Sequence, residues 1–104
     1  MDCGLLWEHL GLESLQAAFP DDPIRYWRDK AGRKVDLVRA RSRDEGGAIE
    51  CKWDAGAFDP AALKVFRSHY PKGCNYLVTP LFGPAYRRRF AELEVQVCSP
   101  AGLK

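Results

Sequence analysis

Two short apolar segments that carry charged residues constrain the fold of this chain more than any other feature. In residues 35–38, Val-Asp-Leu-Val, the carboxylate of Asp36 interrupts a run of branched apolar residues. In residues 49–52, Ile-Glu-Cys-Lys, strand alternation places Glu50 and Lys52 on one face and the two other residues on the opposite face. Burying a carboxylate is costly unless it is paired or binds a metal. The two segments therefore predict strands whose charges converge on a site.

The segment between these strands, residues 41–47, is polar and ends in two glycines, which is typical of a hairpin loop. If the loop centres on Arg43, Asp36 lies opposite Glu50. If it centres one residue later, Asp36 lies opposite Lys52. In either register the charged side chains share one face of an antiparallel pair, where directly opposed β-carbons are about 5 Å apart. Like charges that close repel each other unless a cation lies between them or one carboxylate is protonated.

Periodicity and turn residues predict the remaining elements. Helical spacing of apolar residues predicts a helix from Leu5 to Phe19 with Glu8 on its apolar face, and Gly11 as a weak point in it. A second helix has Asp59 as its N-cap and Pro60 at its first position. The other predicted elements are strands at 24–28, 33–40, 47–53, 75–79 and 94–98, and a helix at 85–93.

This order of elements predicts an α/β fold. Tight turns make the first three strands an antiparallel meander, and the helix over residues 60–70 crosses over to set the fourth strand parallel to the third. The result is an αβββαβ core, with a mixed sheet of four to five strands flanked by helices. We expect the 104 residues to form a single domain, 1–104, with frayed ends at 1–3 and 99–104.

The four cysteines and the hydropathy of the chain indicate a cytoplasmic protein. The cysteines are scattered and include no Cys-x-x-Cys pair, so a structural zinc site is not expected. Cys51 and Cys98 lie in apolar strand patterns, where a reduced cysteine packs as a small hydrophobe. No apolar run approaches the roughly 20 residues that a membrane span requires.

An Asp on one strand followed by Glu-x-Lys on the next resembles the PD-(D/E)XK nuclease-like superfamily, which includes many restriction endonucleases and archaeal Holliday-junction resolvases. Three further segments are similar to a narrower group, the nuclease-like domain found C-terminal to an AAA+ ATPase module in many bacterial and archaeal proteins. These segments are Gly4-Leu5-Leu6-Trp7-Glu8, Ile24-Arg25-Tyr26-Trp27-Arg28-Asp29-Lys30 and Val35-Asp36. The resemblance runs from Gly4 to about Thr79 and implies a restriction-endonuclease-like version of the core. One departure is Lys34, because the family commonly has an acidic residue two positions before its strand Asp.

The resemblance implies a metal-dependent endonuclease that hydrolyses phosphodiesters. Asp36 and Glu50 would hold Mg²⁺ or Mn²⁺, with the backbone carbonyl of Cys51 as a third ligand. Hard oxygen ligands suit these ions. Lys52 would orient the attacking water, and Glu8 would hold a second ion or a water beside the first. The alternatives are a cross-strand ion pair on a solvated sheet face and, for Glu8, an ion pair with a nearby arginine, Arg25 or Arg28.

Basic residues provide candidate phosphate contacts for a nucleic acid, with DNA the expected partner. They are Arg39, Arg41, Arg43, Arg87, Arg88 and Arg89. Lys and Arg contacts to phosphate carry no sequence information, and such clusters also occur on ordinary solvated surfaces. The rival function is a non-catalytic module of the same fold that docks on a protein partner through exposed Trp7, Trp27 and Trp53.

The resemblance makes an AAA+ ATPase module the expected protein partner. The chain contains no Gly-x-x-x-x-Gly-Lys-Ser/Thr phosphate loop. It is therefore expected to be an excised domain, a stand-alone remnant, or a small protein that works beside another. A homodimer is a further expectation, since symmetric substrates suit twofold enzymes.

Overall fold

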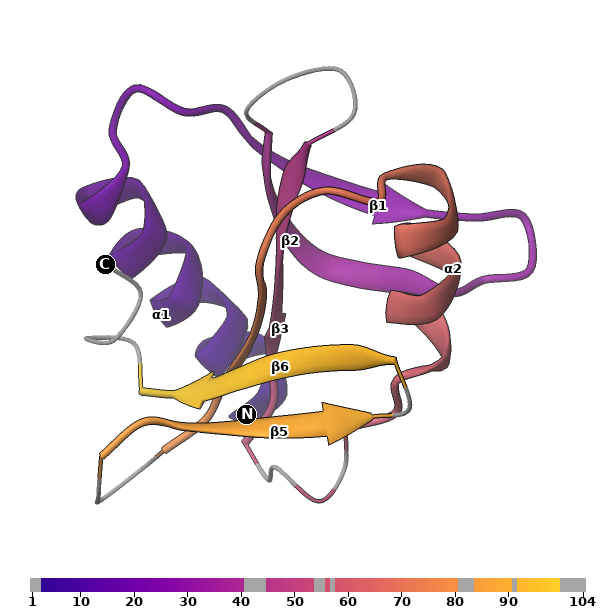
Figure 1. Ribbon diagram of the computed structural model, residues 1–104. Helices are drawn as coiled ribbons and strands as arrows, with labels where there is room; N and C mark the ends of the chain where they lie inside the picture. The colour runs from indigo at the N-terminus through magenta and orange to yellow at the C-terminus, as the bar shows by residue number, and fades with distance from the viewer. Residues whose placement is uncertain are drawn as a thin grey trace.

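One mixed sheet with a helix on each face organises the chain in a computed structural model (Figure 1). The structure describes residues 3–40, 45–53, 56, 58–80, 84–90 and 92–99, with side chains from Trp7 onward. The elements are α1 (Cys3–Ala18), β1 (Ile24–Arg28), β2 (Lys34–Ala40), β3 (Gly46–Cys51), α2 (Ala61–His69), β4 (Asn75–Val78), β5 (Tyr86–Phe90) and β6 (Leu93–Cys98). Arg41, Arg43 and most of the ends that were expected to fray lie outside the described residues.

The strand order of the sheet is β1-β2-β3-β4-β6-β5. The first three strands pair antiparallel, and β3–β4 and β4–β6 pair parallel. The predicted meander and the crossover through α2 are therefore confirmed. The sheet of the described residues has six strands, so the predicted four to five was too few.

The register of β2 and β3 selects one of the two predicted alignments. Leu37 pairs with Ile49, and the pairing continues to the loop without a shift. Extended by one residue away from the loop, the same register sets Asp36 opposite Glu50. This is the alignment of a loop centred on Arg43, so the alternative that sets Asp36 opposite Lys52 is wrong.

An irregularity in β2 falls between Val35 and Val38, the stretch that contains Asp36. Along β1, Arg25 pairs with Val38, and two residues later Trp27 pairs with Val35. Strand β2 therefore contains one more residue than β1 over this stretch, as in a β-bulge. Bulges turn a side chain away from the direction that simple alternation gives it. Val35 and Val38 consequently pack into the same core, although they are three residues apart.

Two hydrophobic cores form, one between the sheet and each helix (Figure 1). The α1 side contains Trp7, Leu15, Leu37, Ile49, Cys51, Val78 and Cys98. The α2 side contains Val35, Val38, Ala48, Phe58, Leu63, Phe66, Leu77, Val95 and Val97. The alternation of Ile49 and Cys51 toward one face is as predicted, and both cysteines expected to pack as small hydrophobes are buried.

Gly11 allows α1 to lie close to the sheet. A β-carbon at this position would be 2.6 Å from Sγ of Cys51, closer than side-chain atoms approach. The sequence presents Gly11 as a weak point in the helix, where it costs about 1 kcal/mol relative to Ala. Close packing of α1 on β3 offsets this cost, because only Gly permits the contact with Cys51.

The predicted helix over residues 85–93 is wrong. Residues 86–90 form strand β5, which pairs with β6 from Tyr86–Val97 to Phe90–Leu93. Arg, Ala, Glu and Leu favour helices locally. The backbone hydrogen bonds of the hairpin decide otherwise, as tertiary pairing often overrides propensity.

The second helix begins one residue later than predicted. Ala61 is its first residue and Pro60 occupies the N-cap position. The carboxylate of Asp59 accepts a hydrogen bond of 3.0 Å from the Ala61 amide. Asp59 therefore still satisfies an amide at the start of α2. No helix among the described residues is long and apolar enough to cross a membrane.

Candidate functional site

The predicted charged residues meet where β2 begins and β3 ends. Lys52 follows the last residue of β3, and its amide donates to the carbonyl of Val78 at 3.0 Å, which extends the pairing with β4. Trp7 on α1 also donates its indole N–H to this carbonyl, at 2.8 Å. The site therefore lies beside the carboxyl ends of neighbouring parallel strands, where ligands commonly bind in open α/β sheets.

Asp36 is the centre of the site. Its side chain is 2% exposed, and Oδ2 accepts a 2.9 Å hydrogen bond from the Cys51 amide. The Lys52 ammonium is 3.6 Å from Oδ2, and the Lys34 ammonium is 3.8 Å from Oδ1. Asp36 thus lies between two lysines. We call Glu8, Lys34, Asp36, Glu50 and Lys52 the charged cluster.

Glu50 is buried and incompletely paired. The residue is 6% exposed, and its Oε2 lies 3.7 Å from Nζ of Lys52. Its Oε1 has no hydrogen-bond partner. Burial, followed by the charge of Asp36, raises the pKa of Glu50 from 4.5 to about 8. Such crowding of a buried carboxylate with a second one is relieved by a proton or by a cation.

Glu8 reaches the same group from α1. Burial, then the charge of Asp36 and a hydrogen bond with it, raise the pKa of Glu8. Of the two interpretations of Glu8, its electrostatic interactions with Asp36, Lys34 and Lys52 favour the one in which it faces the strand charges. A small cavity of about 110 Å³ adjoins it, lined by Glu8, His9, Leu12, Tyr26 and Leu37.

Lys52 is held by the carboxylates around it. Burial lowers the pKa of an ammonium, but Asp36 and Glu50 outweigh this effect, so the pKa of Lys52 is raised. Lys52 therefore carries a positive charge at neutral pH and serves as a charged donor rather than a base. These contacts also show that the strand charges form a buried group and not the ion pair of a solvated face.

The donor set fits a hard divalent cation. Among the described residues, no three side chains of the types His, Cys, Asp and Glu are arranged to hold a metal ion. Mg²⁺, however, usually keeps several waters and takes only one or two carboxylates from the protein. Asp36 and Glu50 meet that requirement, and Oε1 of Glu50 is a buried acceptor without a donor. Glu8 interacts with Asp36 and so can orient that carboxylate.

The predicted nucleic-acid contacts that the structure describes do not gather into one patch, because Arg39 and the three arginines of β5 lie on strands that are not neighbours in the sheet. Arg39 pairs with Asp22 at 3.1 Å, stacks on the ring of Phe19, and has a side chain only 14% exposed. It supports the fold from the α1 side. Arg41 and Arg43 lie outside the described residues. Arg39 therefore offers little surface to a phosphate.

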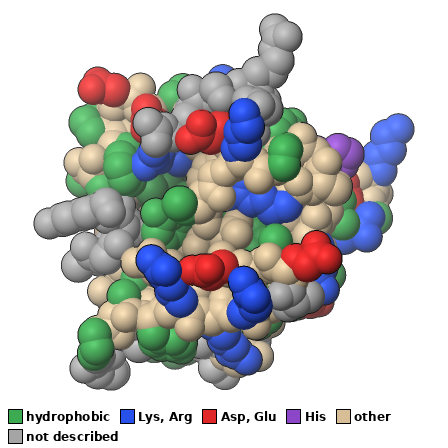
Figure 2. Space-filling view, viewed as in Figure 1, with side chains coloured by type: hydrophobic (Ala, Val, Ile, Leu, Met, Phe, Trp, Pro, Cys, Tyr) green, Lys and Arg blue, Asp and Glu red, His purple; other side chains and the backbone are tan. Residues whose placement is uncertain are grey.

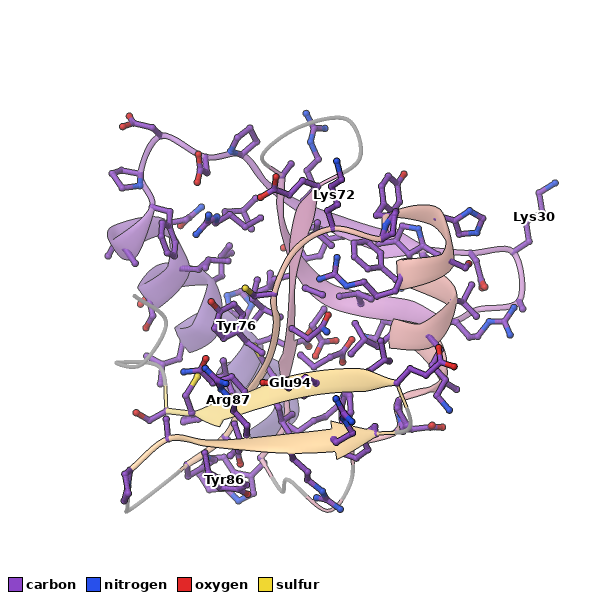
Figure 3. All side chains as sticks on the ribbon, in the orientation of Figure 1. Lys30, Lys72, Tyr76, Tyr86, Arg87 and Glu94 are labelled. Carbon is purple, nitrogen blue, oxygen red and sulfur yellow. The ribbon has the colours of Figure 1, made fainter. Side chains whose placement is uncertain are left out.

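Arg87, Arg88 and Arg89 lie on strand β5, and we call them the arginine strand. All three are exposed, but alternation along a strand sends the middle one to the opposite face. Arg87 lies 3.3 Å from Glu94 on β6, and the two side chains are labelled in Figure 3. On the face shown in Figure 2, Lys and Arg side chains are mixed with Asp and Glu.

The tryptophans that were expected to be exposed have different environments. Trp7 is buried at 9% exposure and Trp27 packs edge-on against Phe66, so the expectation of exposure is wrong for Trp7. Trp53 is 56% exposed and meets Trp7 edge-on at 5.6 Å. Tyr26, at 73%, is more exposed than any of them. Trp53, one residue beyond Lys52, therefore places an exposed aromatic ring beside the site.

Lys34 is the member of the charged cluster that was not predicted as a site residue. Its signal was present in the sequence, because residues two apart in a strand project toward the same face. Its contact with Asp36 makes it part of the site.

Comparison with known proteins supports the fold and leaves the family open. No protein-family model matches the sequence, and no curated protein is significantly similar to it. A solved structure does match: a refined half-complex from a tetradecameric assembly of Thermococcus gammatolerans McrB AAA+ hexamers with bound McrC. The superposition has a TM-score of 0.65 at 13% identity and covers 98% of this chain. It covers 30% of that chain, so this protein resembles less than a third of its length.

Proposed function

We propose that this chain is a nuclease-like domain that binds nucleic acid and hydrolyses phosphodiester bonds with Mg²⁺ or Mn²⁺. The observation that carries the proposal is the buried pair of Asp36 and Glu50, with an unpartnered carboxylate oxygen and Lys52 against both. A structural ion pair has no need of a second buried carboxylate with an oxygen that lacks a donor. A cation-binding site does, because that oxygen is free to bind the ion.

Each residue of the charged cluster that takes part in the proposed reaction has a separate role. Asp36 and Glu50 would hold the ion, together with the carbonyl of Cys51. A divalent ion there would polarise a phosphate oxygen and lower the pKa of a nearby water. Lys52, kept positive by its neighbours, would orient the attacking water and offset charge as the transition state forms. Glu8 would position Asp36 through their shared hydrogen bond.

The surroundings of the site suit an unpaired or distorted nucleic acid strand. Trp53 and Tyr26 are exposed aromatic rings, and every base has a face that stacks on such rings. The exposed arginines of β5 would add phosphate contacts that are independent of sequence. DNA is the expected nucleic acid.

A cleavage assay with matched variants tests the proposal. We expect the protein to cut single-stranded or junction DNA with Mg²⁺ or Mn²⁺. Asp36→Asn keeps an acceptor for the Cys51 amide but removes the charge, and it should abolish cleavage while the thermal unfolding transition persists. Glu94→Gln is the control, because it removes a carboxylate outside the charged cluster. Full activity in Asp36→Asn would refute the catalytic role.

The second candidate function is a non-catalytic module that docks on an AAA+ protein. The observation in its favour is the likeness to part of a chain from an assembly of AAA+ hexamers. Exposed Trp53 and Tyr26 would contribute contact area. This function predicts no metal affinity at the charged cluster. Mn²⁺ titration monitored by backbone amide NMR separates the two, since signals confined to residues 8, 36 and 50–52 would broaden only if the metal site is intact.

A further inference from the structure

The position of Lys34 suggests an additional role for this residue, which rests on the proposed function. Its ammonium is 3.8 Å from Oδ1 of Asp36, whereas the other oxygen, Oδ2, is taken by the Cys51 amide and Lys52. The Lys34 side chain is 48% exposed, so it approaches from the solvent side. Lys34 therefore faces the carboxylate oxygen that an incoming cation would use.

Lys34 also interacts electrostatically with Glu8, another carboxylate of the charged cluster. Its charge opposes the rise in the pKa of Glu8, which places it near that carboxylate too. The charged cluster then holds three carboxylates and two ammonium groups, of which Lys52 contacts two carboxylates and has a side chain 32% exposed, against 48% for Lys34. Moving the Lys34 ammonium out of the charged cluster costs less free energy than moving that of Lys52, because about half of the Lys34 side chain is already exposed to water.

We propose that Lys34 is a displaceable internal counter-ion that competes with the divalent metal for Asp36 and so sets the metal affinity of the site. In the metal-free protein it offsets the repulsion among the carboxylates. When a cation enters, the lysine side chain swings into solvent, where it is free to meet a phosphate. Lys34 is thus a positioning and affinity-setting residue.

The test measures Mn²⁺ affinity by calorimetry in the wild type and three variants. Lys34→Gln removes the competing charge and should bind Mn²⁺ about three- to tenfold more tightly. Lys34→Arg keeps the charge and should retain the wild-type affinity. Lys30→Gln is the matched control, because it changes the net charge equally and projects from the β1–β2 turn, away from the sheet (Figure 3).

A metal-free measurement supplies an independent readout. At low salt without divalent ions, Lys34→Gln should unfold at a lower temperature than Lys30→Gln, because the carboxylates lose half of their counter-charge. Added Mn²⁺ should stabilise Lys34→Gln more than the wild type. Equal melting temperatures of the two variants would contradict the counter-ion role.

The outcomes separate this inference from the proposed function. Tighter binding in Lys34→Gln alone supports the inference, including the case in which the wild type binds too weakly to measure. Equal affinity in all four proteins overturns it and leaves the metal site standing. Equal tightening in Lys34→Gln and Lys30→Gln also overturns it, since bulk charge then explains the effect. No binding in any protein overturns the metal site and, with it, the competition.

Discussion

The two charged regions of the sheet differ in how far they are removed from water. In the charged cluster, Asp36 and Glu50 are nearly inaccessible and crowd one another. In the arginine strand, the side chains are exposed, and Arg87 pairs with Glu94 while both remain in solvent. The sequence marks both regions as charged. Burial decides which of them is chemically unusual, because a charge in water is screened and a buried one is not.

The largest expected effect is a change in the pH dependence of the free energy of unfolding when Glu50 is replaced. The pKa of Glu50 is about 8 in the folded protein, against 4.5 ordinarily, so the folded state holds a proton that the unfolded state releases between these values. The stability that the folded protein has with Glu50 protonated is fully present below pH 4.5 and is lost as pH rises from 4.5 to 8. Glu50→Gln should remove that loss and stabilise the protein at pH 8 by roughly 2–4 kcal/mol relative to the wild type.

Urea unfolding at several pH values between 4.5 and 8.5 measures this effect. The wild type and Glu50→Gln should have similar stability near pH 5 and diverge as pH rises. Glu94→Gln is the control in the exposed region, where no such divergence is expected. Parallel curves for the wild type and Glu50→Gln would mean that Glu50 ionises normally.

Asp36→Ala should be the next largest change. It removes the acceptor of the buried Cys51 amide and the carboxylate beside Lys52. Removing one partner from a buried charged group is strongly destabilising, here by roughly 2–3 kcal/mol since relief of the repulsion with Glu50 offsets part of the loss. Chemical denaturation of Asp36→Ala beside Asp36→Asn checks it, because Asn retains an acceptor. Equal stability of the two variants would show that the hydrogen bond contributes little.

Gly11→Ala should have an intermediate effect by moving α1 away from the charged cluster. The added methyl group would overlap Sγ of Cys51. Overpacking costs about 1–3 kcal/mol, and the gain in helix propensity returns about 1 kcal/mol, so a net loss of roughly 1 kcal/mol is expected. The double variant Gly11→Ala/Cys51→Ala should recover stability relative to Cys51→Ala alone. Destabilisation by Gly11→Ala that persists in the Cys51→Ala background would point to a different cause.

The smallest effect is expected in the arginine strand. Arg87→Ala breaks an exposed ion pair, and such pairs contribute about 0–1 kcal/mol, so a loss below roughly 0.5 kcal/mol is expected. Thermal unfolding at low and high salt measures it, and added salt should shrink the difference further. A loss as large as that of Asp36→Ala would contradict the contrast between the two regions.

Local pattern was sufficient to predict the position and type of most elements. Strand β1 lies at the predicted residues, and the segments around Asp36 and Glu50 are strands that bring their charges together. The reason is that alternation and turn residues act over a few positions. Where a helix and a strand are both locally favourable, the local pattern does not predict which of them forms. Residues 86–90 show this, since their helix propensity is real but β6 supplies the hydrogen bonds of a strand.

The sequence by itself therefore determined that carboxylates and a lysine would share a strand pair, with a parallel crossover beside them. Tertiary structure alone decided the register that sets Asp36 against Glu50, the irregularity in β2, and the approach of Glu8 and Lys34. These features depend on contacts between residues far apart in the chain, whose energies no local pattern contains. Burial is the clearest case, because the raised pKa of Glu50 arises from the exclusion of water and from the charge of Asp36 on the neighbouring strand.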